Sequence, residues 1–185
     1  MSRIPLIEKE RLTPEMQQFV DQVEEMTGDN TAMRVLAYRP EMLRKFADFY
    51  WHLQTESLLD RKLIEMVRLA VAQINRCPSC LKGRYQDSFE QGLTEELIAR
   101  LPEAETSEGF TERERAAIAF GQKMASDHWS VGDEDFERLF QHFTVEEVVE
   151  LNMMVAQFIG IGRIFAAINA INPVCEIRLP QPAVA

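Results

Sequence analysis

The sequence lacks any stretch of about 18 uninterrupted apolar residues, which is the length that a membrane-spanning helix needs. Its opening segment, MSRIPLIEKE, also lacks the apolar run of a signal peptide. These absences exclude a membrane span and a cleaved leader from the expected structure. We therefore expect a cytoplasmic protein that has no membrane as a partner.

Cysteine is scarce, with three residues in a chain of 185. Three cysteines in a reducing compartment do not build a disulfide framework, so a closely spaced pair is expected to be catalytic or metal-binding. Cys77 and Cys80 form such a pair, at C-x-x-C spacing. Cys175 stands alone near the C-terminus, and we interpret it as an ordinary packed or exposed thiol.

Basic residues are in deficit, because 20 Lys and Arg oppose 30 Asp and Glu and leave a net charge of −10. The acidic residues are spread along the chain, which disfavours binding to a phosphate backbone or an anionic membrane. We therefore expect no nucleic acid partner. The apolar share of 46% is that of an ordinary globular protein, and we expect one domain over residues 1–185.

Sustained alternation of β-branched residues is absent, whereas helix start and stop signals recur, so we predict an all-α fold. A helix is expected after the Thr13-Pro14 cap and another after Asp60. The capping boxes that begin at Thr111 and Thr144 predict helices of about fifteen and twenty-five residues. Further helices are expected near 32–38, from Pro40, and from Pro78 to about Gln91.

Two segments, residues 63–74 and 148–168, are apolar on nearly every side of the expected helix. Such a helix is typical of a domain centre or of a subunit interface, and a small monomer offers few partners for two of them. We therefore expect a homo-oligomer. Gly160 and Gly162, within the second segment, are expected to permit close approach of another backbone.

The C-x-x-C pair is expected to be redox-active. Pro78 suits the first position of a helix, which makes Cys77 the N-cap and places Cys80 in the first turn. The positive end of the helix dipole lowers the pKa of a thiol there and increases its reactivity. The alternative is two small buried side chains at a helix junction. Zinc would need further ligands at suitable spacing, and the three histidines do not provide it, so we expect no metal and no cofactor.

Glu65 places a carboxylate within the apolar segment 63–74, where a charge is costly unless it is paired. It is either a functional base or the partner of Arg61 or Arg68 in a salt bridge. Twelve residues of straight helix would hold Glu65 about 18 Å from Cys77. The two can cooperate only if the chain folds back after Ile74.

Glu65, Cys77 and Cys80 together resemble the core signature of the AhpD-like group in the carboxymuconolactone decarboxylase family. That signature is a glutamate, eleven intervening residues, C-x-x-C, three more residues and a histidine. The likeness covers roughly residues 35–170. It includes the run RPEML from Arg39, the turn GLT from Gly92, the helix start FTE from Phe110 and the final apolar helix.

The resemblance implies an AhpD-like helical bundle that assembles into trimers or hexamers. It also implies an antioxidant peroxidase, whose cysteines reduce a hydroperoxide and are then recycled by a dithiol partner. In the family the second cysteine, here Cys80, attacks the peroxide, while the glutamate and histidine relay protons. Helix geometry instead favours Cys77 as the more acidic thiol. We follow the resemblance and assign the attack to Cys80.

The sequence departs from the family signature at Arg84, which stands where the histidine is expected. Arginine stays protonated and cannot relay a proton. If one helix continues from Pro78, Arg84 lies on the same face as Cys80, and its charge stabilises a thiolate. We then expect weak hydroperoxide turnover with comparatively efficient disulfide exchange. The alternative is an exposed arginine paired with Asp87 or Glu90.

Three functions remain open from the sequence. The leading one is a cysteine-based peroxidase or disulfide oxidoreductase that acts on a hydroperoxide or disulfide substrate through Cys77, Cys80, Glu65 and Arg84. The second is a helical oligomer without enzymatic activity that keeps the thiols as a redox sensor. The third is an enzyme of other chemistry in which Glu65 is a base within an apolar pocket.

Overall fold

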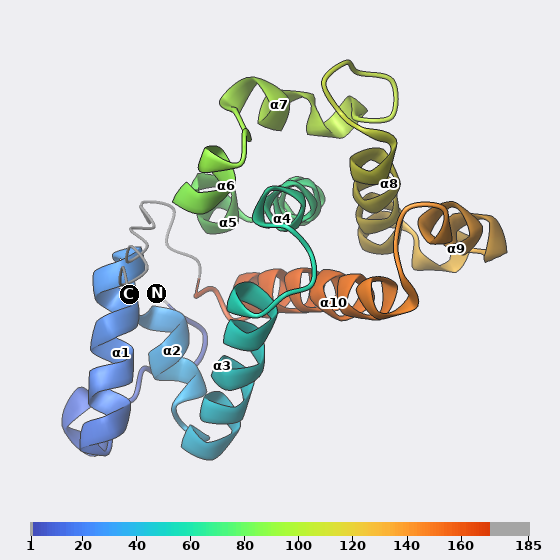
Figure 1. The fold of residues 1–185 in the computed structure, drawn as a ribbon. Helices are drawn as coiled ribbons and strands as arrows, with labels where there is room; N and C mark the ends of the chain where they lie inside the picture. Colours follow the sequence, from blue (N-terminus) through green and yellow to red (C-terminus); the bar gives the residue numbers. More distant parts are fainter. Residues whose placement is uncertain (1, 171–185) are drawn as a thin grey trace.

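The chain, in a computed structural model that describes residues 2–170, is helical throughout its regular structure, as the sequence predicts. Figure 1 shows helix α4 at the centre, with α8 and α10 on one side and the short helices α5 to α7 on another. The helices are α1 (Pro14–Thr27), α2 (Thr31–Leu36), α3 (Pro40–Thr55), α4 (Arg61–Asn75), α5 (Pro78–Lys82), α6 (Gln86–Glu90), α7 (Glu95–Arg100), α8 (Glu112–Ser126), α9 (Asp133–Phe140) and α10 (Val145–Ala167), with 3₁₀ turns at Lys9–Arg11, Leu101–Glu103 and His128–Ser130.

Helix α4 is the core of the protein, because two apolar clusters meet on it. Val67 and Val71 pack with side chains of α8 and α10 in one cluster. Met66 and Leu69 pack in the other, with side chains that include Leu93. Ten consecutive residues, 63–72, are buried, so the prediction of a helix that is enclosed on all sides is confirmed within a single chain.

The predicted helix starts are confirmed by their capping hydrogen bonds. The Asp60 carboxylate accepts from the backbone N–H of Leu63 at 2.8 Å. Thr111 and Thr144 each form a complete capping box, opening helices of 15 and 23 residues. Gly28 ends α1 with a φ of 73°, the left-handed conformation that glycine adopts without strain.

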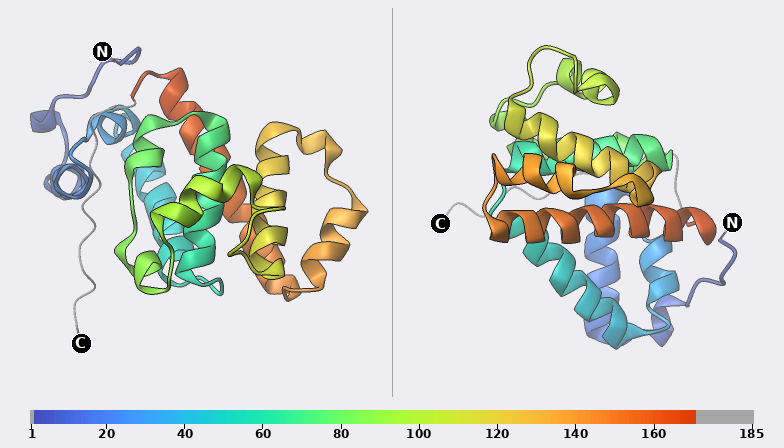
Figure 2. Two further views of the ribbon diagram at one scale, coloured as in Figure 1. Left: turned by 90° about the horizontal axis from the view of Figure 1, so that it is seen from above. Right: turned by 90° about the vertical axis from the view of Figure 1, so that its right-hand side faces the viewer.

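Helix α10 runs between two layers of the molecule. Figure 2 shows it between the layer of α4 and α8 and the N-terminal helices α1 to α3. By length and composition it is the one helix among residues 2–170 that could cross a membrane, but core helices of soluble proteins meet the same test. Its inner face, which includes Leu151, Met154 and Phe158, belongs to the core.

The segment after Pro78 differs from the prediction. The expected single helix from Pro78 to about Gln91 is two short helices, α5 and α6, separated by residues 83–85. The carbonyl of Gly83 accepts from the Arg68 guanidinium at 2.9 Å, and the carbonyl of Leu81 accepts from Arg84. Arginine side chains therefore satisfy carbonyls that a continuous helix would use, and the helix ends at Lys82.

Candidate functional site

A left-handed turn at Arg76 folds the chain back after α4. Arg76 has φ 50° and ψ 44°, and the backbone N–H of Cys77 donates to the carbonyl of Ala72 at 3.1 Å. This turn places α5 over the middle of α4, where Arg68 Nη1 donates to the carbonyl of Cys80 at 2.6 Å. The chain therefore folds back after α4, as cooperation of Glu65 with the cysteine pair requires.

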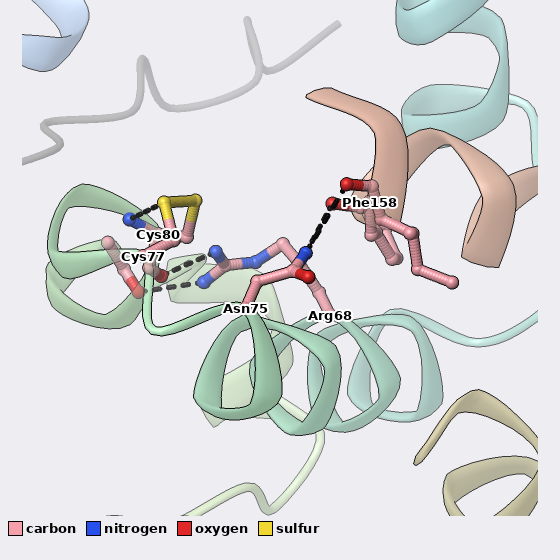
Figure 3. The surroundings of a disulfide bond; sticks show 7 residues. Arg68, Asn75, Cys77, Cys80 and Phe158 are labelled. Atoms are coloured by element: carbon pink, nitrogen blue, oxygen red, sulfur yellow. Dashed lines mark hydrogen bonds between the residues drawn. A yellow bond between two sulfur atoms is a disulfide. The ribbon is translucent and has the colours of Figure 1, made fainter. Parts of the chain in front are cut away.

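Cys77 and Cys80 are joined by a disulfide at the start of α5, with their Cα atoms 5.3 Å apart (Figure 3). The backbone N–H of Cys80 donates to Cys77 Sγ at 3.3 Å, which is the N-cap geometry predicted for Cys77. Their exposure differs: Cys77 is 2% exposed, whereas Cys80 is half-buried and lines a cavity. A reactant in that cavity meets Cys80.

Glu65 and Arg68 form a buried ion pair beneath the disulfide. Glu65 is 0% exposed, and its two oxygens accept from Arg68 Nε at 2.6 Å and Nη2 at 2.7 Å. Arg68 also donates to the carbonyls of Cys80 and Gly83 (Figure 3). One guanidinium therefore connects the Glu65 carboxylate to α5. Burial lowers the pKa of Arg68, but the carboxylate outweighs it and raises that pKa above its ordinary value.

The salt-bridge interpretation of Glu65 is therefore confirmed, with Arg68 as its partner. Arg61, the other possible partner, pairs with Asp87 at 2.8 Å instead. The pairing satisfies the charge that would otherwise be costly at this depth. Glu65 does not line the cavity, so its effect on the cysteines passes through Arg68.

Two tyrosines complete the polar side of the site. The hydroxyls of Tyr50, on α3, and Tyr85, in the break between α5 and α6, lie 3.2 Å apart. The guanidinium carbons of Arg61 and Arg68 lie 4.6 Å and 5.4 Å from the centre of the Tyr85 ring. Burial raises the pKa of Tyr85 well above its usual value, with a further contribution from Tyr50 that Arg68 partly opposes.

A cavity of about 260 Å³ joins these groups. Its polar lining includes Cys80, Arg68, Tyr50 and Tyr85, with Thr27 and Asp29 near the end of α1, while helices α1, α2, α3 and α10 supply the apolar lining. Bulky members of that apolar side are Phe19, Phe46, Trp51 and Phe165. A pocket with a mainly apolar wall and a few convergent polar groups is typical of a small-molecule site.

Arg84 lies elsewhere than the sequence predicted. The expectation that it shares a helical face with Cys80 is wrong, because α5 ends at Lys82. Its guanidinium donates to the carboxylate of Glu95, on α7, at 2.7 Å and 3.1 Å. This pair also replaces the alternative pairing with Asp87 or Glu90. Arg84 does not line the cavity, so its charge serves the contact between α5 and α7.

Sequence reasoning missed Tyr50 and Tyr85, and gave Arg68 no role beyond a partner for Glu65. Tyr85 directly follows the position of the missing histidine, which is a signal in the sequence. Tyr50 carries no such signal, because it lies 35 residues from Tyr85 and reaches it only through packing. Cys175 lies outside the described residues. Among residues 2–170, no group of three His, Cys, Asp or Glu side chains is placed to hold a metal ion.

Comparison with known proteins agrees with this geometry. Residues 40–123, which run from α3 into α8 and include both cysteines, match the model of the carboxymuconolactone decarboxylase family. A peroxidase-related protein with an alkylhydroperoxidase AhpD core, from Ralstonia eutropha JMP134, has a TM-score of 0.70 at 23% identity over 91% of this chain and 90% of its own. This match and the shared fold support an AhpD-like, carboxymuconolactone decarboxylase-like family for the chain.

Two further proteins are similar to this chain. The debrominase Bmp8, in a complex with 2,3,4-tribromopyrrole, has a TM-score of 0.72 at 16% identity, over 90% of this chain and 89% of its own. YdfG, an uncharacterized protein from Bacillus subtilis (strain 168), is 25% identical over 115 residues, which are 62% of this chain and 78% of YdfG. The AhpD-like fold therefore carries more than one chemistry.

Proposed function

We propose that the protein reduces organic hydroperoxides with the Cys77–Cys80 pair. The Cys80 thiolate attacks the outer oxygen of the peroxide, the O–O bond breaks, an alcohol leaves, and the sulfur becomes a sulfenic acid. The Cys77 thiol then attacks that sulfur, which forms the disulfide and releases water. A dithiol reductant returns both cysteines to thiols. The overall reaction consumes one hydroperoxide and two thiols, and yields an alcohol, water and one disulfide.

The observation that carries this proposal is the position of Cys80 on the wall of an apolar cavity, directly bonded to a buried Cys77. A peroxidatic cysteine must be reachable by its substrate, whereas a resolving cysteine needs only to reach its partner. This arrangement supports Cys80 as the attacking residue, and the apolar wall favours a hydroperoxide with a hydrocarbon group over hydrogen peroxide.

The same geometry gives roles to the other predicted residues. Glu65 is proposed as a positioning residue, because it orients Arg68, which holds the carbonyls of Cys80 and Gly83. The proposal that Glu65 is a base in a pocket is less well supported, since its oxygens are both engaged and the cavity does not reach it. Arg84 is proposed to fix the end of α5 through Glu95.

Reductive dehalogenation of a small aromatic ring is a second candidate function. Aromatic side chains such as Phe46 and Trp51 line the same cavity as Cys80, and Bmp8 shares the fold. The electron balance is also the same, because two thiols release two electrons when they form one disulfide, and replacing a carbon–bromine bond by carbon–hydrogen consumes two electrons and a proton and releases bromide. Release of bromide from a brominated pyrrole by the reduced protein would favour this function over peroxide reduction.

The test is one equivalent of tert-butyl hydroperoxide added to the reduced protein, followed by mass analysis. The wild type should lose two hydrogens at Cys77 and Cys80. The Cys77→Ser variant should instead stop at a sulfenic acid on Cys80 that dimedone traps, and Cys80→Ser should not react. The Cys175→Ser variant is the control and should behave as the wild type. Trapping on Cys77 in a Cys80→Ser protein would reverse the proposed order.

Turnover separates an enzyme from a sensor. With excess dithiothreitol, the wild type should consume hydroperoxide continuously, while Cys77→Ser and Cys80→Ser should both lose this cycling. A wild type that forms the disulfide once but does not turn over would support the redox-sensing oligomer. A wild type whose cysteines do not change at all would reject both redox functions.

A further inference from the structure

The reaction proposed above needs an acid that the family signature supplies as histidine and this chain does not. When Cys80 attacks, the departing oxygen carries a negative charge, and an alkoxide is a poor leaving group unless it is protonated. Residue 84 is arginine, which holds its proton and faces Glu95. Neither Cys77 nor Glu65 fills this gap, because Cys77 is buried and Glu65 lies outside the cavity.

We propose that the hydroxyl pair of Tyr50 and Tyr85 donates the proton to the oxygen that leaves when Cys80 attacks a hydroperoxide. Both tyrosines line the same cavity as Cys80. The two hydroxyl oxygens are 3.2 Å apart, so one donates its proton to the other. The proton of the hydroxyl that accepts this bond has no acceptor of its own among the contacts described for residues 2–170. That proton is available to a ligand in the cavity.

The surroundings of the pair suit a proton donor. Burial raises the pKa of Tyr85, so this hydroxyl keeps its proton at neutral pH until a strong base such as an alkoxide forms in the cavity. After transfer, the tyrosinate receives a hydrogen bond from the other hydroxyl. It also lies near the positive charge of Arg68, which acts on both tyrosines.

The proton balance is complete without another reactant. Cys80 loses its proton to solvent before the attack, and the tyrosine pair gives one proton to the alkoxide, which leaves as an alcohol. The tyrosinate then recovers a proton from solvent. The thiolate sulfur is oxidised to the sulfenic acid, and the peroxide is reduced, so the tyrosines change protonation but not oxidation state.

The test compares two oxidants that differ in their leaving group. tert-Butyl hydroperoxide releases an alkoxide, which needs a proton, whereas peracetic acid releases a carboxylate, which is stable without one at neutral pH. Single-turnover disulfide formation is measured in the wild type, in Tyr50→Phe, in Tyr85→Phe and in the double variant. Phenylalanine keeps both rings, including the packing of the ring at position 85 against Arg61 and Arg68. The matched control is Tyr38→Phe, because Tyr38 is the remaining tyrosine of the chain and is exposed.

The double variant should react about 100-fold more slowly with tert-butyl hydroperoxide, within the usual range for general acid catalysis, and at an unchanged rate with peracetic acid. Each single variant should lose less, because one hydroxyl remains. Tyr38→Phe should match the wild type with both oxidants. The oxidant dependence separates a lost proton donor from a disturbed site, which would slow both reactions alike.

The two proposals fail in different ways. One outcome is that the wild type and the double variant reduce tert-butyl hydroperoxide at the same rate. The tyrosine assignment is then overturned, and the proposed peroxidase function remains. Equal slowing with both oxidants also overturns the assignment, because it indicates a structural role. A wild type that reduces neither oxidant overturns the proposed function, and the tyrosine assignment with it.

Discussion

At the scale of single residues, the site depends on one buried ion pair. Glu65 is fully buried, and the side chain of Arg68 is 7% exposed. A buried pair contributes little net stability, but the loss of one partner leaves an uncompensated charge, which costs about 3 to 5 kcal/mol. Arg68 also donates hydrogen bonds to the carbonyls of Cys80 and Gly83. Any displacement of its guanidinium therefore also displaces the helix that contains the C-x-x-C pair.

Glu65→Gln should therefore lower the free energy of unfolding by about 3 kcal/mol, because Arg68 keeps its charge without a carboxylate. Urea denaturation of the oxidised protein measures the change. Glu95→Gln is the matched control, since it removes the carboxylate from the more exposed pair with Arg84 and should cost less than about 1 kcal/mol. Equal losses in the two variants would contradict the special weight given to the buried pair.

The start of α5 at Cys77 could be predicted from neighbouring residues, whereas its end at Lys82 could not. Pro78 and the C-x-x-C spacing predicted the N-cap geometry of Cys77, which is confirmed by the hydrogen bond from Cys80. The end of α5 was not predicted, because it depends on Arg68, fifteen residues before Gly83 in the sequence. A residue that far away adds no signal to the helical pattern after Pro78.

At the scale of elements, α10 contains two glycines with different surroundings. A Cβ built on Gly162 would lie 3.1 Å from Nδ2 of Asn75, at the end of α4, whereas one on Gly160 would meet nothing within 4 Å. Asn75 Nδ2 also donates to the carbonyls of Phe158 and Ile159, at 3.3 Å and 3.4 Å (Figure 3). Gly162 therefore gives room to the side chain of Asn75 and not to another backbone, and the predicted close backbone approach is found at neither glycine.

Gly160→Ala should raise the stability of the protein by up to about 1 kcal/mol, since alanine favours the helix and the added methyl group meets no neighbour. Gly162→Ala should gain less or lose stability, because it presses on Asn75 and its bonds between α4 and α10. The midpoints of thermal unfolding of the two variants give the comparison. If Gly160→Ala proves the more destabilising, another surface must cover that position.

At the scale of the whole molecule, one face of α10 stays exposed. Val145, Val149 and Met153 follow each other at four-residue spacing and are 62%, 59% and 47% exposed. Phe140, on α9, is a further exposed apolar side chain. An apolar stripe of this kind is typical of a surface that another subunit covers. Self-association, which the sequence predicted from the same helix, remains a prediction.

Light scattering should report an oligomer at micromolar concentration, and the resemblance predicts a trimer or a hexamer. Val149→Glu should shift the protein toward the monomer, because it places a charge in the apolar stripe. Met42→Glu is the control, since Met42 is also exposed, at 49%, but lies on α3 and not on α10. A wild-type monomer, or equal dissociation by both variants, would count against α10 as the interface.

Local sequence patterns were enough to predict the long helices of this protein and its motif, but not the break between α5 and α6. Caps such as Asp60 and Thr111 act within one helical turn, and the all-round apolar pattern of α4 needs no knowledge of its partners. The spacing of Glu65, Cys77 and Cys80 is likewise local, and it was enough to indicate the family that the comparison supports.

The assembly of the site depends on tertiary packing and could not be predicted from the sequence pattern. Arg76 is a non-glycine residue in the left-handed conformation, so no glycine in the sequence marks the turn that brings α5 over Arg68. The Tyr50–Tyr85 pair joins α3 to the break between α5 and α6. The cavity is lined by residues from both ends of the described chain, from Phe19 to Ala170. Such contacts depend on how whole helices pack, because side chains far apart in sequence meet only after the core between them has formed.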